Sequence, residues 1–315
     1  MVEYNLSMAP PPHLLSEKTD AGIMLDVIIA LLFPTAAAVY LFGPWVLFMC
    51  SLGIASAVMI EAGCQFIMGR EITVRDGSAA VTGFLVALSL PVTAPIWSIL
   101  LGNAFAIIVV KQLHGGIGRN WFNPAVAARL MLKLFFEPQI TQWVSPGPDA
   151  VTTATPLEYL GHFTRTVPPD LPPLSDLFWG NMGGGIGEVS KFIVLIGCVD
   201  LVWRKVIDIR VPIAVTAGTA MVFFLYSGFN ATFTLYHVLS GTLIFAAVFM
   251  VTDYSSGPLN LRARITFAFL IGILTALLRI IFQLPGGIGI AILIMNAFSR
   301  PLDKMLRPRV TGHKN

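Results

Sequence analysis

Ten apolar segments run along the chain, each long enough or nearly long enough to cross a bilayer. The first five cover Gly22–Leu41, Trp45–Met68, Ser78–Leu90, Ile96–Leu113 and Asn123–Phe136, and the second five cover Val189–Val202, Val211–Phe229, Thr234–Val251, Ile265–Phe282 and Gly287–Phe298. The third, fifth and tenth are short, and glycine or proline bounds or interrupts several of them. The pattern predicts an all-α integral membrane protein with about ten transmembrane helices, some of them broken or re-entrant.

Composition supports a membrane protein and excludes some other classes. Hydrophobic residues make up 56% of the 315 and charged residues 12%, whereas a soluble domain carries about 25% charge. The basic residues are dispersed at segment ends, which does not favour nucleic-acid binding. Cys50, Cys64 and Cys198 form no C-x-x-C pair, and no His, Cys or carboxylate group shows ligand spacing. We therefore expect no metal site.

The placement of Lys and Arg predicts the orientation of the chain. Fifteen of the 20 basic residues fall in alternate loops and in the two tails, and the short loops near Pro44, Pro91, Asn230 and Pro285 have none. The positive-inside rule then places both termini in the cytoplasm. The expected organisation is a cytoplasmic tail at 1–21, a membrane repeat at 22–137, an extracytoplasmic loop at 138–188, a second repeat at 189–302 and a cytoplasmic tail at 303–315.

The two groups of segments contain similar sequences at equivalent places. Gln112-Leu-His-Gly-Gly-Ile-Gly118 precedes the fifth segment, and Gln283-Leu-Pro-Gly-Gly-Ile-Gly289 precedes the tenth. Thr82-Gly83 and Ser240-Gly241 correspond less closely. Five segments is an odd number, so two such halves must have opposite orientations in the membrane, which predicts inverted repeats with sites near their interface. Chance recurrence in a glycine-rich membrane protein is the alternative.

A polar stretch between the halves, Asp149–Leu157, has the pattern of a helix start. Thr155 suits the N-cap, Pro156 the first helical position, and Glu158 the third position of a capping box. A helix start is the structural interpretation of this stretch.

The same stretch resembles the flavinylation motif of the NqrB/RnfD family of membrane flavoproteins. Asp149, Thr152, Ala154 and Thr155 match the motif, whereas Thr153 stands where the family has glycine. In the family a separate flavin transferase links FMN to the last threonine through a phosphoester, which implies covalent FMN on Thr155. A phosphate ester on an N-cap hydroxyl would also lie at the positive end of a helix dipole.

Three further motifs extend this resemblance over more than half of the chain: Gly118–Ala125, Phe249–Tyr254, and Ala291–Asn296 followed by Arg300–Asp303. The family's non-covalent riboflavin lies toward the cytoplasm, so the resemblance suggests Asn120 and Asn123 as riboflavin contacts. Asp253 would contact a flavin or a cation, or would be an ordinary interfacial residue. By inversion of the repeat, Gly286 and Gly287 would help to cradle FMN on the outer face.

Four ionisable residues lie inside apolar segments: Asp26, Glu61, Asp200 and Arg279. A charge is energetically unfavourable there, so such residues usually have a function. Asp26 and Asp200 lie near segment ends and could reach water. Glu61 lies deeper, and we consider it either part of a cation or proton route or a partner in a structural hydrogen bond.

The resemblance implies an electron-transfer subunit of an Rnf-type ferredoxin:NAD⁺ oxidoreductase in a prokaryotic inner membrane, an ion-translocating complex coupled to Na⁺ or H⁺. The short N-terminal tail favours the Rnf branch of the family. Electrons would pass from FMN outside to riboflavin inside. Implied partners are an extracytoplasmic FMN-carrying subunit, a cytoplasmic NAD-side subunit, the flavin transferase and membrane lipid, with no nucleic acid. An NqrB-like subunit of a Na⁺-translocating quinone reductase and a flavin-free transporter with inverted repeats remain alternatives.

Overall fold

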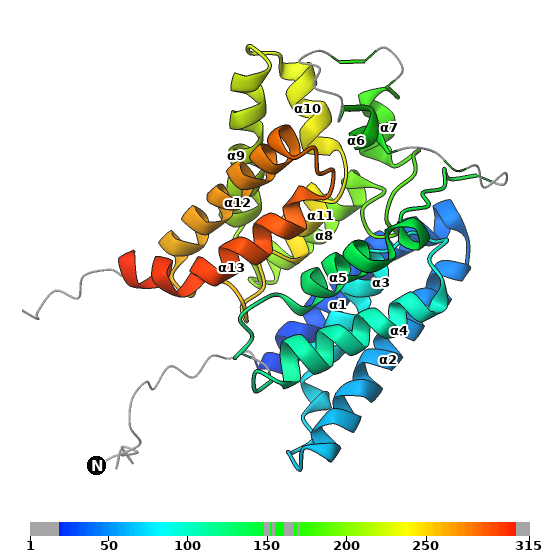
Figure 1. Cartoon of the computed structure of the whole chain (residues 1–315), viewed down its shortest axis with the longest axis vertical. Coiled ribbons are helices and arrows are strands. Elements are labelled where there is room, and N and C mark those ends of the chain that lie inside the picture. The colour runs from blue at the N-terminus through cyan, green and yellow to red at the C-terminus, as the bar shows by residue number, and fades with distance from the viewer. Residues whose placement is uncertain are drawn as a thin grey trace, which may run out of the picture.

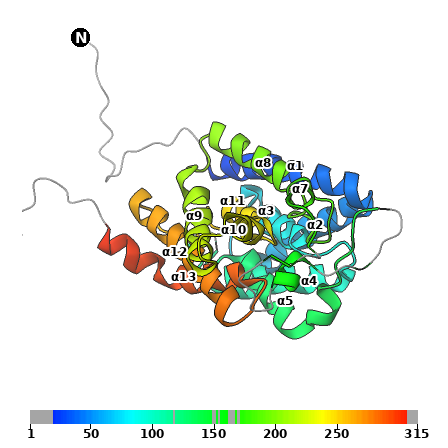
Figure 2. The same cartoon turned by 90° about the horizontal axis from the view of Figure 1, so that it is seen from above.

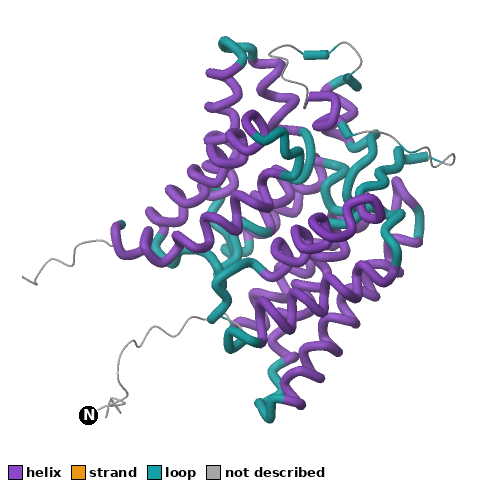
Figure 3. The backbone as a smooth tube through the Cα atoms, viewed as in Figure 1, coloured by secondary structure: helices purple, strands orange, loops and turns teal. Residues whose placement is uncertain are grey.

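The computed structural model describes residues 19–116, 118–147, 152, 155–160, 167–168 and 171–306, and every regular element in this part of the chain is a helix (Figure 3). The all-α prediction is therefore confirmed. The first group comprises α1 (Asp20–Phe42), α2 (Trp45–Ile67), η1 (Val74–Asp76), α3 (Ser78–Leu88), α4 (Ile96–Ala104), η2 (Phe105–Gln112) and α5 (Pro124–Ile140). The remaining helices are α6 (Pro156–Leu160), α7 (Leu174–Trp179), α8 (Lys191–Trp203), α9 (Arg210–Tyr226), α10 (Ala231–Leu239), α11 (Leu243–Phe249), α12 (Leu261–Ile281) and α13 (Gly287–Met305).

Helices begin within a few residues of the starts of all ten predicted segments, but four segments differ in continuity or length. The fourth changes from α4 into a π-helix, η2, in which Leu113 N–H bonds to the Ile108 carbonyl 3.0 Å away. The fifth was predicted to end at Phe136, but α5 continues to Ile140 with a kink at Phe136. The eighth is broken between α10 and α11, which meet at a bend of 57°. The tenth was predicted to end at Phe298, but α13 continues to Met305. Hydropathy marks only the apolar part of a helix, so the polar end of α13 was missed.

Three helices, α1, α2 and α12, are long and apolar enough to cross a membrane, and the bent pair α10 and α11 together would make a fourth. Each of the three exposes many apolar side chains. An exposed apolar surface on long helices is typical of lipid contact. The structure therefore agrees with an integral membrane protein.

The helices form two groups that meet along two helix pairs. In Figure 1, α2, α4 and α5 lie at the lower right and α9, α12 and α13 at the left. Between the groups α1 contacts α8 and α5 contacts α13, and Figure 2 shows α1 and α8 together along one edge. The core draws on most of the helices, and α3 and α11, which are almost entirely buried, lie near its centre (Figure 2).

Two helices end inside the protein, where their last carbonyl groups need donors. At the end of α3, Gly187 N–H donates to the Leu88 carbonyl (2.7 Å) and Arg129 Nε to the Ser89 carbonyl (3.0 Å). At the break after α10, Arg279 donates from Nη1 to the His237 carbonyl (2.6 Å) and from Nη2 to the Ser240 carbonyl (3.4 Å). An arginine from a neighbouring helix thus compensates each interruption.

Candidate functional site

The predicted helix start at Thr155 is confirmed. α6 begins at Pro156, the Glu158 carboxylate accepts a hydrogen bond from Thr155 N–H (3.0 Å), and Glu158 N–H donates to the Thr155 carbonyl (2.9 Å). Leu157 packs on the break between α10 and α11, where Gly241 has φ 69° and a Cβ atom would lie 2.5 Å from Leu157 Cδ1. The left-handed backbone conformation of Gly241 favours glycine, and the missing side chain leaves room for Leu157 to pack α6 against this break.

Thr155 lines a cavity of about 380 Å³, which we call the Thr155 cavity. The surrounding residues come from α5, α6, the α11 region and the loop before α13: Ser89, Val126, Arg129, Leu130, Lys133, Glu137, Thr141, Trp143, Thr155, Leu157, Glu158, Glu188, Gly241, Thr242, Ala246, Met250, Pro285, Gly286, Ile288 and Gly289. Gly286 is therefore beside the same space as Thr155. Gly287 packs on α12, where a Cβ would lie 3.1 Å from Leu278 Cβ.

Of the other matching residues of the flavinylation motif, only Thr152 is among the described residues. Asp149 and Ala154 lie outside the described residues. Thr152 is exposed and pairs with Val144 in an isolated antiparallel bridge. Their role in flavin attachment stays a prediction.

Charged side chains gather along one wall of the Thr155 cavity. Lys133 and Glu137 are paired one helical turn apart on α5, with 3.6 Å between Nζ and Oε1. Glu188 is buried, and its Oε1 accepts a hydrogen bond from Gly185 N–H (2.8 Å). Arg129 belongs to none of the ion pairs between described residues. Its guanidinium lies 6.0 Å from the centre of the Trp143 ring.

A second polar group, the Asn123 cluster, joins three of the sequence motifs and consists of Asn123, Asp253, Ser255, Ser256 and Asn296. Asn123 Nδ2 lies 3.3 Å from Asp253 Oδ2, and Asn123 N–H donates to Asn296 Oδ1 (3.2 Å). Both serine hydroxyls donate to Asp253 at 2.9 Å, and Asn296 Nδ2 donates to the Ser256 carbonyl (3.1 Å). Asn123 also caps α5, as its position before Pro124 predicts.

Asn120 lies between two cavities beside this cluster. The larger, of about 290 Å³, is lined by Gly118, Asn120, Trp121, Tyr254, Ser255, Ser256, Gly257, Leu259, Asn296, Ala297, Ser299, Arg300, Pro301 and Asp303. We call it the Asn120 cavity. The smaller one, of about 80 Å³, reaches Lys111, Asn123 and Asp253. Asn120 is buried, and its Oδ1 has no hydrogen-bond partner among the described residues. An unpaired buried acceptor indicates a site that a hydrogen-bonding ligand could complete.

Helix α5 brings the Asn123 cluster close to the Thr155 cavity. Asn123 caps the helix, and Val126, three residues later, already lines the Thr155 cavity. At 1.5 Å per residue the helix advances only about 4.5 Å between them. Met250 bridges the sites as well, because its carbonyl accepts from Asn123 Nδ2 (3.2 Å) and it lines the Thr155 cavity.

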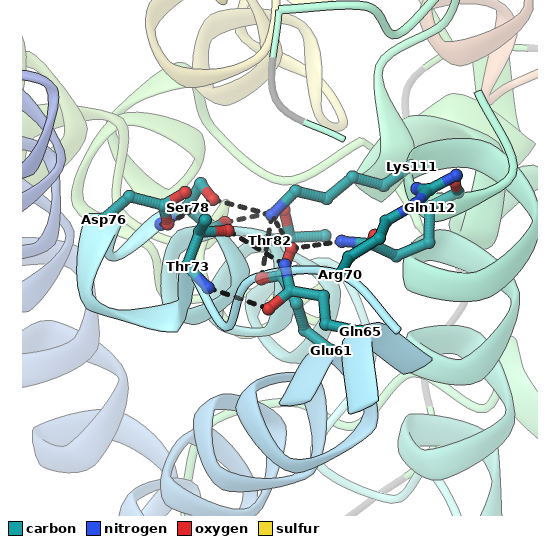
Figure 4. A network of polar contacts seen from close by, with 9 residues as sticks. All are labelled: Glu61, Gln65, Arg70, Thr73, Asp76, Ser78, Thr82, Lys111 and Gln112. Atoms are coloured by element: carbon teal, nitrogen blue, oxygen red, sulfur yellow. Dashed lines mark hydrogen bonds and ion pairs between the residues drawn. The ribbon is translucent and has the colours of Figure 1, made fainter. Parts of the chain in front are cut away.

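Glu61 lies in a separate buried network between α2, α3 and η2 (Figure 4). Its carboxylate pairs with Lys111 Nζ at 2.7 and 2.9 Å and accepts from Gln112 Nε2 (2.6 Å), and Lys111 also donates to Ser78 Oγ (2.6 Å). The Lys111 and Glu61 side chains are 2% and 1% exposed. Lys111 therefore lies in the π-helix with its ammonium group directed inward to Glu61.

The other intramembrane charges also have partners. Arg204 forms ion pairs with both Asp26 and Asp200, at 2.9 Å each. These carboxylates therefore meet one guanidinium near the end of α8. Arg279 is occupied by the carbonyls of the α10 break, and Asp303, from the last family motif, accepts from Leu259 N–H (2.8 Å) and Asn260 N–H (3.0 Å) at the start of α12.

Comparison with known proteins adds a family to this geometry. Residues 7–312 match the model of the NQR2, RnfD, RnfE family. The chain belongs to this family. Among its relatives, the D subunit of the Na(+)-translocating ferredoxin:NAD(+) oxidoreductase complex of Acetobacterium woodii is 38% identical, covering 99% of this chain and 97% of the relative.

Two other relatives in the NQR2, RnfD, RnfE family show similar coverage. The D subunit of the ion-translocating oxidoreductase complex of Stutzerimonas stutzeri is 33% identical over 92% of this chain and 91% of its own. The D subunit of the proton-translocating ferredoxin:NAD(+) oxidoreductase complex of Clostridium ljungdahlii is 31% identical over 96% of this chain and 95% of the relative. The resemblance inferred from the sequence motifs is thus confirmed at the level of the family.

Proposed function

We propose that the chain is the electron-transferring D subunit of an ion-translocating ferredoxin:NAD⁺ oxidoreductase complex, with covalent FMN at Thr155 and riboflavin at the Asn120 cavity. The observation that carries the proposal is the position of the Asn123 cluster, whose members Ser255, Ser256 and Asn296 line the Asn120 cavity. Along α5, Asn123 of this cluster is only about 4.5 Å of helical rise from Val126 of the Thr155 cavity. The names of the relatives supply the class of complex.

The Thr155 cavity fits FMN in size and chemistry. Its volume of about 380 Å³ lies in the range of ordinary ligand pockets. Val126, Met250 and Ile288 offer an apolar surface for the isoalloxazine ring, and Lys133 offers a positive charge for the phosphate. Close to Lys133 is Gly286, where a Cβ atom would lie 3.6 Å from Nζ. The Gly286–Gly287 turn thereby leaves room beside the ammonium group.

The Asn120 cavity fits riboflavin through its polar groups. The Asn120 Oδ1 acceptor is without a partner among the described residues, and Trp121 offers an aromatic face. Arg300 lies over that ring at 5.4 Å from its centre. Asp253 would hold Asn123 in position through their hydrogen bond. A flavin needs both hydrogen-bond partners along its pyrimidine edge and a flat apolar bed.

In this proposal the flavins supply the redox chemistry and the protein supplies position and electrostatics. α6 holds Thr155 at the cavity because Leu157 packs closely against Gly241. Val126 and Met250 are buried apolar residues that line the Thr155 cavity next to the Asn123 cluster. The Asn123 cluster holds the loop that follows α11 against α5 and α13.

We further infer that the two helix groups are inverted repeats with about ten spans, both termini in the cytoplasm and Thr155 outside. The two contacts between the groups, α1 with α8 and α5 with α13, each join the first or the last helix of one group to its counterpart. Two copies related by a pseudo-two-fold axis would meet in this way. The domain limits given above and the positive-inside pattern belong to the same proposal.

The proposed partners are the complex's extracytoplasmic FMN-carrying subunit, its cytoplasmic NAD-side subunit and a flavin transferase. One relative is named for Na⁺ and another for protons, so the names support coupling to either ion. A route through Glu61 would have to compete with Lys111 for the carboxylate.

The test of covalent FMN is in-gel flavin fluorescence of denatured protein expressed with an active flavin transferase. Wild type should fluoresce, Thr155→Ala should be dark, and Thr242→Ala, which alters another threonine of the same cavity, should match wild type. Losing the cap in Thr155→Ala should reduce stability by about 1 kcal/mol. A dark wild-type band would overturn the proposal and favour a flavin-free transporter.

Riboflavin binding is tested separately in the Thr155→Ala protein, where flavin released on denaturation measures only the non-covalent cofactor. Asn120→Leu should reduce this flavin about tenfold or more, because a polar ligand left without its partner loses one or more hydrogen bonds. Thr242→Ala is again the control. Unchanged flavin in Asn120→Leu would contradict the assignment of the Asn120 cavity.

A further inference from the structure

Arg129 has an unusual environment for a cation in a membrane protein. It lies on α5 and its Nε donates to the Ser89 carbonyl (3.0 Å), which fixes the guanidinium at the end of α3. None of the ion pairs between described residues includes it. Its Nη1 is enclosed and has no hydrogen-bond partner in the described part of the chain. Enclosed polar groups usually have hydrogen-bond partners, so the Nη1 donor of this half-buried side chain is available to a ligand.

The position of Arg129 in the Thr155 cavity indicates which part of a flavin it would meet. Thr155 and Lys133, the groups suited to a phosphate, lie near α6 and the Gly286 loop. Arg129 is one turn before Lys133 on α5 and one turn after Val126. Residues three or four apart share a helix face. Arg129 therefore lies beside the apolar surface of Val126, on the side that leads to Asn123.

We propose that Arg129 is the side chain that stabilises the negative charge of the reduced flavin ring in the Thr155 cavity and so raises its midpoint potential. This inference rests on the proposed function. Reduction adds an electron to the ring, and charge builds along its N1–C2=O edge. In a site of low dielectric constant a fixed cation stabilises that charge strongly. A guanidinium that forms no direct ion pair in the described part of the chain is suited to the task, because the nearby carboxylates Glu188 and Glu137 offset its charge only in part.

The experiment is a spectroelectrochemical titration of the purified full chain carrying covalent flavin. The titration of Thr155→Ala supplies the signal of the non-covalent flavin, which is subtracted. Arg129→Gln should weaken the preference for the reduced flavin about tenfold, a fall of ~59 mV for a one-electron couple. Arg129→Lys keeps the charge and should stay within about threefold of wild type. Arg204→Gln is the matched control, because it removes the same charge from a residue that does not line the Thr155 cavity and that is paired with Asp26 and Asp200.

The outcomes separate this inference from the function on which it rests. A dark wild-type band in the in-gel assay refutes the proposed function itself. Fluorescent Arg129→Gln with an unchanged midpoint potential overturns only the role of Arg129. Equal shifts in Arg129→Gln and Arg204→Gln also overturn it, because they would show that the potential responds to the net charge of the protein and not to Arg129 in particular. Arg129→Gln could instead lose most of its covalent flavin while the protein that still carries flavin keeps the wild-type potential. That result would assign Arg129 to the phosphate and contradict the inference.

A second variant keeps the test informative if Arg129→Gln does not accumulate. Glu188 lines the same cavity, and Gln at this position can still accept from Gly185 N–H. Glu188→Gln removes the negative charge that partly offsets Arg129. The equilibrium between oxidised and reduced flavin should then shift a few-fold toward the reduced form, which raises the midpoint potential. An unchanged or lowered potential would count against a potential set by Arg129.

Discussion

Lys111 and Arg129 are both cations held between helices of the first group, but their surroundings differ. Lys111 meets the Glu61 carboxylate at 2.7 and 2.9 Å, so the pair is neutral as a whole. Arg129 meets a backbone carbonyl and lines the Thr155 cavity. A paired charge mainly holds helices in register, whereas an unpaired charge can act on a ligand. The comparison teaches that the partner of a buried charge decides its role.

The largest expected effect is on stability and comes from breaking the Lys111–Glu61 pair. Lys111→Met leaves the Glu61 carboxylate buried without its counter-charge and should destabilise the protein by about 3–5 kcal/mol. Thermal or SDS-induced unfolding in detergent, followed by tryptophan fluorescence, measures the change. The double variant Glu61→Gln, Lys111→Met removes both charges and should regain most of the loss. A loss below about 1 kcal/mol in the single variant would contradict a tight buried pair.

The same double variant also tests the ion route through Glu61 in the intact complex. If Glu61 is structural, ion movement and electron flow should both stay near the wild-type rates. If Glu61 carries the coupling ion, electron transfer to the flavins should persist while ion uptake into membrane vesicles is lost. Rates of both processes in the same vesicle preparation decide between the two.

A middle-sized effect is expected where arginines compensate interrupted helices. Arg279→Gln leaves two carbonyls at the α10 break without a donor, and Arg129→Gln leaves one at the end of α3. A buried acceptor without a partner costs about 1–3 kcal/mol, so Arg279→Gln should be the more destabilising. The unfolding assay described above measures both variants. The reverse order would show that the carbonyl bonds are not the main contribution of these side chains.

The smallest effect is expected at Arg204, which is 31% exposed and pairs with Asp26 and Asp200. Solvent screens such pairs, so Arg204→Gln should change stability less than either Arg279→Gln or Arg129→Gln does. Differential scanning fluorimetry at low and high salt measures the change, and the difference from wild type should shrink with salt. A loss as large as that of Lys111→Met would remove the distinction between exposed and buried pairs.

Local patterns in the sequence were enough for several features of this protein. The apolar segments located the helices, Asn123-Pro124 marked the start of α5, and Thr155-Pro156 with Glu158 marked the start of α6. The motifs pointed to the correct family. These features depend on residues close together in the chain, so periodicity, capping chemistry and motif spacing are sufficient to predict them.

Only the tertiary structure decided the partners of the charged side chains and the closeness of the Asn123 cluster to the Thr155 cavity. No local pattern relates Glu61 to Lys111, Asn123 to Asp253, or Arg129 to Ser89, because each pair is separated by 40 or more positions in the chain. The sequence alone does not show that Lys111, at the end of an apolar segment, lies in a π-helix with its ammonium group directed inward. Helix packing determines which distant groups meet, and in a medium of low dielectric constant that meeting determines whether a charge is neutralised or free to act.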